Sequence, residues 1–264
     1  MRIARRTLMA VILFSLCAPA LAQSLDVKID GNLPEIHKFE AEVTKKAKLD
    51  YLVYLPEGYD ASEKEWPVLF WLHGDGAQPL RGGLAELRSY GPPKMSEQGW
   101  DHPFIIVAPQ LWGEVHWDPD TLHAVLKKIL ADYRVDEDRV YLMGYSRGGF
   151  GTWEFACSYP EYFAAVVPIS ARAMTAIERI KDVPIWIFHG AKDTGVPVEG
   201  ANNMHAELKS VGTDVRFTLY PNVGHNACDP AMKTPELWAW LAAQERGGGR
   251  PSRAPQSNSS NPNK

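Results

Sequence analysis

The sequence has few cysteines, no basic cluster and no apolar run long enough to cross a membrane as a stable helix. Only three of the 264 residues are cysteine, and no Cys/His group has the spacing of zinc ligands. Acidic residues outnumber basic ones by 32 to 28, and no patch of Lys and Arg is interleaved with aromatic residues. Nucleic-acid binding needs clustered Lys and Arg, so we expect neither a nucleic-acid partner nor a bound metal.

The N-terminal residues have the pattern of a secretory signal peptide. Three arginines precede the apolar run from Leu8 to Leu16, and small residues stand at Ala20 and Ala22. A basic start, a short apolar segment and an A-x-A-like end predict cleavage after residue 22, with an uncleaved anchor as the alternative. Removing residues 1–22 removes three positive charges and no negative one, so the formal charge changes from −4 to −7. We expect an exported protein, periplasmic or secreted.

The rest of the chain divides into one domain and a tail. Residues 23–244 are long enough for one sizeable core, whereas residues 245–264 are rich in Gly, Pro, Ser and Asn and are predicted to be a disordered tail. Cys157 and Cys228 remain after cleavage. Export permits a disulfide between them, but the sequence cannot show that they meet, and two separate buried thiols are the favoured interpretation.

Short apolar runs alternate with helical patterns along the domain. Helical spacing of apolar residues appears at 121–133, 148–159, 198–211 and 234–243. Strand patterns appear at 49–59, 66–74, 104–110, 139–144, 164–170, 183–190 and 214–221. This alternation predicts an α/β fold, with a mostly parallel central sheet covered by helices on both faces and the first strand antiparallel at an edge. Ligands bind at the carboxyl ends of the strands in such sheets.

A serine fenced by glycines follows the strand at 139–144. Gly144-Tyr145-Ser146-Arg147-Gly148 matches G-x-S-x-G between a buried strand and a helix, which is the context of a nucleophile elbow. A tight turn there lifts the serine hydroxyl above the sheet, and glycines two positions away avoid clashes. The alternative interpretation is a glycine-rich turn with a helix-capping serine.

A serine nucleophile needs a base and an acid, which follow it in this order along α/β-hydrolase chains: Ser, then Asp or Glu, then His. Asp193 and His225 lie in loops after two later strands, at the same edge as Ser146. His189 is predicted to pack or to bond to backbone at a strand end, and His205 lies in a helical pattern. The other acids fit less well: Asp214 starts a strand at the opposite edge, and Asp229 is a candidate cap after His225.

Acyl transfer also needs hydrogen-bond donors for the oxygen that becomes negatively charged. One is the backbone N–H after the nucleophile, here that of Arg147. We assign the second to the N–H of Asp75 in the "HGDG" loop after the strand at 66–74, with Gly76 as the alternative and a plain turn as the remaining interpretation. The Arg147 side chain either lies along the surface or favours an anionic substrate.

These motifs together resemble the secreted bacterial carboxylesterases and predicted peptidases of the α/β-hydrolase superfamily, whose broader relatives are polyhydroxyalkanoate depolymerases, feruloyl esterases and dienelactone hydrolases. The resemblance runs from Leu49 to Leu241 and rests on "LHGDGAQ", "FIIVAPQ", "VYLMGYSRGGFGTWEF", "HGAKDTGVPVEG" and "YPNVGHNACDP". It implies Ser146 as nucleophile, Asp193 as acid and His225 as base. Dienelactone hydrolases use a cysteine nucleophile, and Ser146 departs from that pattern.

The sequence therefore predicts an exported serine hydrolase that cleaves carboxylic esters through an acyl-enzyme, without a metal or organic cofactor. The substrate would be a small-molecule or polymer-derived ester, since no long insertion suggests a lid. Trp112 and Trp117 are candidate walls of the substrate pocket, unless they serve to pin their loop. A prolyl-oligopeptidase-like serine peptidase and a non-catalytic binding protein on the same scaffold remain alternatives.

Overall fold

The computed structural model describes residues 45–75, 84–111, 116–172 and 177–247, all within one compact unit that begins at Lys45. The predicted signal peptide, Gly76 and Trp112 lie outside the described residues, as does the tail after residue 247. The domain boundaries proposed from the sequence therefore stay predictions.

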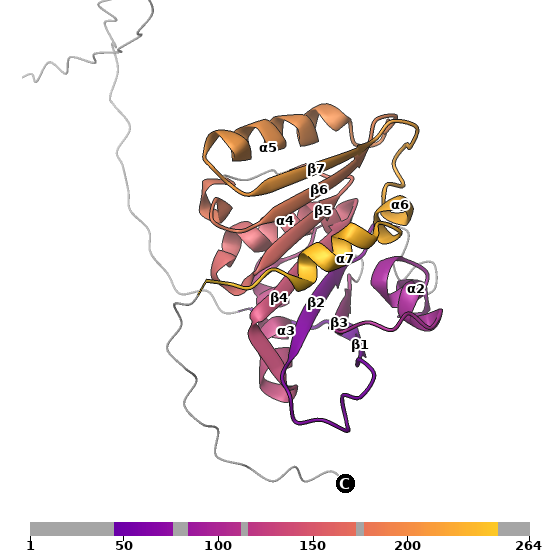
Figure 1. The fold of residues 1–264 in the computed structure, drawn as a ribbon, viewed down its shortest axis with the longest axis vertical. Coiled ribbons are helices and arrows are strands. Elements are labelled where there is room, and N and C mark those ends of the chain that lie inside the picture. Colours follow the sequence, from indigo (N-terminus) through magenta and orange to yellow (C-terminus); the bar gives the residue numbers. More distant parts are fainter. Residues whose placement is uncertain (1–44, 76–83, 112–115, 173–176, 248–264) are drawn as a thin grey trace, which may run out of the picture. The chain divides into compact units, whose positions relative to one another are not determined.

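Seven strands form one sheet in the order β1-β3-β2-β4-β5-β6-β7 (Figure 1). The first strand pairs antiparallel with β3 at the sheet edge, and every other neighbouring pair is parallel. The predicted mostly parallel sheet with an antiparallel edge strand is confirmed. The strands are β1 (Asp50–Tyr54), β2 (Trp66–Leu72), β3 (Ile105–Gln110), β4 (Val135–Tyr145), β5 (Ala165–Ile169), β6 (Ile185–Gly190) and β7 (Val215–Tyr220).

The four predicted helices are present, and shorter ones accompany them. The helix expected from residue 121 begins earlier, at Pro119, because the Asp118 carboxylate caps it by accepting the Thr121 N–H. None of the described helices is both long and apolar enough to span a lipid bilayer. The helices are α1 (Leu84–Leu87), α2 (Gly91–Glu97), α3 (Pro119–Asp132), α4 (Arg147–Ser158), α5 (Val198–Ser210), α6 (Cys228–Met232) and α7 (Pro235–Ala242), with 3-10 turns η3 (Pro160–Tyr162) and η4 (Ile177–Ile180).

Two hydrophobic layers cover the two faces of the sheet. Successive side chains of β2 alternate between them: Phe70 packs in the layer with α3, α4 and α5, and Trp71 in the layer with α6 and α7. Figure 1 shows α7 crossing in front of the sheet, with α4 behind it. Helices on both faces are thus confirmed. Cys157 lies in the first layer and Cys228 in the second, so the sheet separates these thiols and no disulfide joins them.

Helix α4 approaches the end of β2 so closely that only glycine fits between them. A Cβ on Gly148 would lie 1.9 Å from the carbonyl oxygen of Leu72 and 2.4 Å from its carbonyl carbon. Ser146, in the turn between β4 and α4, has a φ of 54° and a ψ of −117°, a conformation that non-glycine residues rarely adopt. This contact fixes where the turn stands above the sheet.

His73 ties the loop after β2 to the end of β3. Its Nδ1–H donates to the carbonyl of Gly74 at 2.7 Å, and its Nε2 accepts the N–H of Leu111 at 3.0 Å. Because Nε2 is an acceptor, the buried ring is neutral. Burial lowers the pKa of His73 to about 4. The neutral imidazole therefore ties residues 73–75, the described part of this loop, to the end of β3.

Replacing Gly148 by alanine is expected to lower the free energy of unfolding by about 3 kcal/mol, because the methyl group overlaps backbone rather than a flexible side chain. Urea denaturation measures this. Gly224→Ala is the control, since a Cβ there meets only an ordinary 3.5 Å contact with the Lys192 carbonyl. Equal stability of the two variants would contradict the close contact.

The low pKa of His73 predicts a loss of stability in mild acid. Between pH 6.5 and pH 4 the unfolded chain takes up a proton at this residue and the folded chain does not. The contribution of His73 to the free energy of unfolding is therefore complete above pH 6.5 and is lost as the pH falls toward 4. We expect His73 to contribute a loss of about 1 kcal/mol between pH 6 and pH 5. Urea denaturation of wild type and His73→Gln at both pH values isolates the effect; identical losses in the two proteins would refute it.

Candidate active site

The structure brings Ser146, His225 and Asp193 into one hydrogen-bonded chain. The distance from Ser146 Oγ to His225 Nε2 is 2.7 Å, and that from His225 Nδ1 to Asp193 Oδ2 is 2.8 Å. The serine follows β4, the aspartate follows β6 and the histidine follows β7. These strands are parallel and end at the same edge, so residues far apart in the sequence meet there.

The Asp193 carboxylate is buried and fully engaged. Its Oδ1 accepts the N–H groups of Gly195 and Val196, both at 2.9 Å, while Oδ2 faces His225 Nδ1. Burial alone would raise the pKa of Asp193, but the hydrogen bonds from Val196 and His225, with that from Gly195, outweigh it and the pKa lies below its usual value. An ionised Asp193 keeps the proton on His225 Nδ1 and leaves Nε2 to accept a hydrogen bond from the Ser146 hydroxyl.

His189, the competing histidine, is bonded to backbone as expected. Its Nε2 lies 2.9 Å from the Val196 carbonyl oxygen and 3.3 Å from Asp193 Oδ2. The side chain is fully buried beneath the loop that carries the aspartate. His189 thus contacts the loop that carries Asp193, whereas the Ser146 hydroxyl is hydrogen-bonded to His225.

Two features that sequence reasoning missed hold the His225 loop in place. The Ser170 hydroxyl donates to the backbone carbonyl of His225 at 2.6 Å, and Ser170 has a φ of 49°. A Cβ on Gly190 would lie 2.0 Å from the carbonyl oxygen of Gly224, so only glycine lets the chain pass just before His225. The available signal for Ser170 was its position directly after β5, at the same edge as the other site residues.

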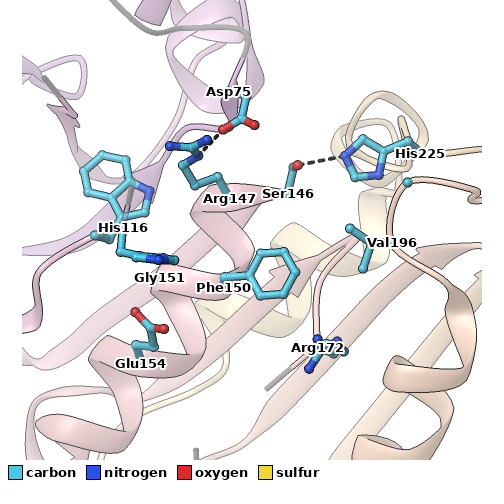
Figure 2. Close-up of a pocket in the computed structure, with 12 residues that line it drawn as sticks. Asp75, His116, Ser146, Arg147, Phe150, Gly151, Glu154, Arg172, Val196 and His225 are labelled. Atoms are coloured by element: carbon cyan, nitrogen blue, oxygen red, sulfur yellow. Dashed lines mark hydrogen bonds and ion pairs between the residues drawn. The ribbon is translucent and has the colours of Figure 1, made fainter. Parts of the chain in front are cut away.

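Gly74, in the loop after β2, lies against Ser146. A Cβ on Gly74 would be 3.2 Å from Ser146 Cβ, which brings the backbone of Asp75 beside the serine. The Asp75 carboxylate forms an ion pair with the Arg147 guanidinium, as Figure 2 shows. The sequence analysis left this guanidinium either on the surface or facing an anionic substrate. The structure instead matches its charge with Asp75 at the rim of the site.

A cavity of about 450 Å³ opens beside Ser146 (Figure 2). Trp117 lines it although its side chain is almost wholly buried, since its ring packs against His73 at 5.0 Å and against Gly151. Trp117 therefore both pins its loop and forms part of the wall. Within the described residues, no three His, Cys, Asp or Glu side chains are grouped to hold a metal ion. The lining residues are Asp75, His116, Trp117, Ser146, Arg147, Phe150, Gly151, Glu154, Arg172, Gly195, Val196 and His225.

Several proteins named as esterases are similar to this chain in sequence or in fold. A probable feruloyl esterase C of Aspergillus terreus is 27% identical over 215 residues, covering 77% of this chain and 74% of the relative. A thermostable esterase of known crystal structure is 30% identical with a TM-score of 0.63; the match covers 75% of this chain and 60% of that one. The feruloyl esterase module of Clostridium thermocellum, at 15% identity and a TM-score of 0.58, shares the fold.

Residues 96–236 match the dienelactone hydrolase family. This segment is more than half of the 264-residue chain and runs from α2 into α7, including all three residues of the hydrogen-bonded chain. The resemblance drawn from the sequence motifs is thereby confirmed at the level of the esterase group. The chain belongs to the dienelactone hydrolase family, and it is a carboxylesterase-like hydrolase of the α/β-hydrolase fold.

Proposed function

We propose that this protein is an exported serine hydrolase that cleaves carboxylic esters through an acyl-enzyme, with Ser146 as nucleophile. The observation that carries the proposal is the continuous contact from Ser146 Oγ to His225 Nε2 and from His225 Nδ1 to Asp193. Membership of the esterase group supports ester hydrolysis over peptide hydrolysis. A complete nucleophile, base and acid argues against a scaffold that only binds.

In the first half-reaction Ser146 Oγ bonds to the ester carbonyl carbon while its proton passes to His225 Nε2. Asp193 stabilises the imidazolium that forms. The tetrahedral intermediate collapses when its bond to the alcohol oxygen breaks, and that oxygen takes the proton from Nε2. Water repeats the sequence on the acyl-enzyme: His225 accepts its proton, the acid leaves, and the proton returns to Ser146.

The negative oxygen of each tetrahedral intermediate needs donors already in position. We assign this role to the backbone N–H groups of Arg147 and Asp75. Arg147 is the first residue of α4, and the backbone N–H groups of a first helical turn are directed beyond the N-terminal end of the helix. The Asp75 backbone is held beside Ser146 by the close contact of Gly74 with the serine. The neutral imidazole of His73 secures the same loop through its bond to the Gly74 carbonyl.

The substrate is proposed to be a small-molecule or polymer-derived ester. The names of the feruloyl esterase relatives make esters of aromatic acids a reasonable first class to assay. The cavity of about 450 Å³ beside the serine is large enough for the acyl group of such an ester. Export rests on the signal-peptide pattern of residues 1–22 alone.

Ser146→Ala is expected to abolish hydrolysis of p-nitrophenyl acetate and butyrate by the protein lacking residues 1–22. Loss of such a nucleophile lowers kcat by on the order of 10⁶. Ser158→Ala, a serine-to-alanine change at the far end of α4, is the control and should keep the wild-type rate. Turnover by Ser146→Ala at the control's rate would remove Ser146 from the mechanism.

Ser170 is proposed as a positioning residue, and its two smallest replacements test the role. Ser170→Ala and Ser170→Gly both remove the hydrogen bond to the His225 carbonyl, so each should lower kcat about tenfold with KM unchanged. Because glycine tolerates a φ of 49°, the glycine variant should be the more stable of the two. If the two variants lose the same share of kcat although their melting temperatures differ, the loss comes from the missing hydrogen bond and not from lower stability. Wild-type kcat in both variants would exclude the role.

A further inference from the structure

The cavity beside Ser146 extends along one face of α4. Its lining positions on this helix are Arg147, Phe150, Gly151 and Glu154, the spacing of a single helical stripe. Figure 2 shows Ser146 and Glu154 toward opposite ends of this stripe, with the Phe150 ring between them. Eight residues of helix separate the two ends by about 12 Å, less the length by which the glutamate side chain leans back toward the N-terminus.

Glu154 is the carboxylate of this cavity that forms no ion pair with a described residue. The other carboxylate, Asp75, is ion-paired with Arg147. Among the described residues, no donor forms a hydrogen bond or ion pair with Glu154. Burial raises the pKa of Glu154, and the nearby His116 opposes this effect. A half-buried carboxylate without a hydrogen-bonded partner is unfavourable, and a donor arriving with a ligand relieves that cost.

The stretch between the two ends is suited to an apolar spacer. Phe150 presents an aromatic surface to the cavity, and the Trp117 ring packs against Gly151 beside it. Arg172 also lines the cavity, and its aliphatic stem packs against Gly200 of α5. The cavity thus offers a reactive serine, an apolar middle and a carboxylate at its remote end.

We propose that Glu154 determines specificity by accepting a hydrogen bond from a hydroxyl or ammonium group carried by the substrate at the end remote from its ester bond. The inference rests on the proposed ester hydrolysis and names its substrate class: esters with an apolar spacer of about six bonds, roughly 7 Å when extended, ending in a hydrogen-bond donor. Glu154 makes no contact with the reacting atoms in this proposal.

Two substrate sets test it, because the donor can be carried on either side of the ester. The acyl set is p-nitrophenyl hexanoate, 6-hydroxyhexanoate and 6-aminohexanoate. The alcohol set is hexyl acetate, 6-hydroxyhexyl acetate and 6-aminohexyl acetate. In at least one set, wild-type kcat/KM should be about tenfold higher for a donor-bearing ester than for the plain one.

Two variants separate charge from hydrogen bonding. Glu154→Leu should abolish the preference for both donors, whereas Glu154→Gln should abolish the preference for ammonium and keep part of that for hydroxyl. The readout within each protein is the ratio of kcat/KM for the donor-bearing ester to that for the plain ester, and circular dichroism with a melting temperature shows that each variant is folded. Glu207→Gln, an exposed site on α5 outside the cavity, is the charge-matched control and should behave as wild type.

The outcomes distinguish this inference from the function on which it rests. If wild type hydrolyses plain esters but prefers the donor-bearing esters less than threefold in both sets, the inference is overturned. A preference that persists in Glu154→Leu overturns it equally. If wild type hydrolyses none of the six esters, the proposed ester hydrolysis itself fails, and the role of Glu154 falls with it.

Discussion

The contact between the first turn of α4 and the end of β2 is the constraint on which the site depends. With only a hydrogen atom on Gly148 to separate them, the helix approaches the Leu72 carbonyl far more closely than any side chain would allow. This approach forces the turn before α4 to be tight, and Ser146 adopts its positive φ there. Gly74, two residues beyond Leu72, lies against the serine as well. One steric condition thus places the hydroxyl and the proposed oxyanion donors together.

The carboxyl edge of the sheet concentrates both strain and buried polar groups. The two non-glycine residues with positive φ in the described part of the chain, Ser146 and Ser170, both stand at this edge. Ser146 contacts the ring of His225, and Ser170 donates a hydrogen bond to the backbone carbonyl of His225. Strained conformations persist only where the surroundings determine them, and here the surroundings are well-packed strands and the hydrogen-bonded Asp193 loop. Rigidity around His225 suits its proposed role as a base, which requires the ring to meet the serine proton at one fixed position.

Helix α4 combines two tasks that are usually divided among several elements. Its N-terminus supports the proposed nucleophile and the proposed oxyanion donor, and the stripe that follows lines the cavity. The ion pair between Asp75 and Arg147 leaves little net charge next to the reacting carbonyl. The remaining acid, Glu154, lies two helical turns further on, so the cavity differs in polarity between its reactive and remote ends.

The sequence by itself determined the strand and helix order, the turn that presents Ser146, and the loops that hold Asp193 and His225. These follow from short-range signals: apolar periodicity, glycine spacing and chain order. It missed α2, because Pro92 and Pro93 look like a break although proline is tolerated in a first turn, and it started β4 too late because charged residues open that strand. Only the tertiary structure decided what depends on distant segments meeting. It set the charge partner of Arg147, the bond from Ser170 to the His225 loop and the separation of Cys157 from Cys228 across the sheet. Such contacts arise from packing in three dimensions, and no local pattern in the chain encodes them.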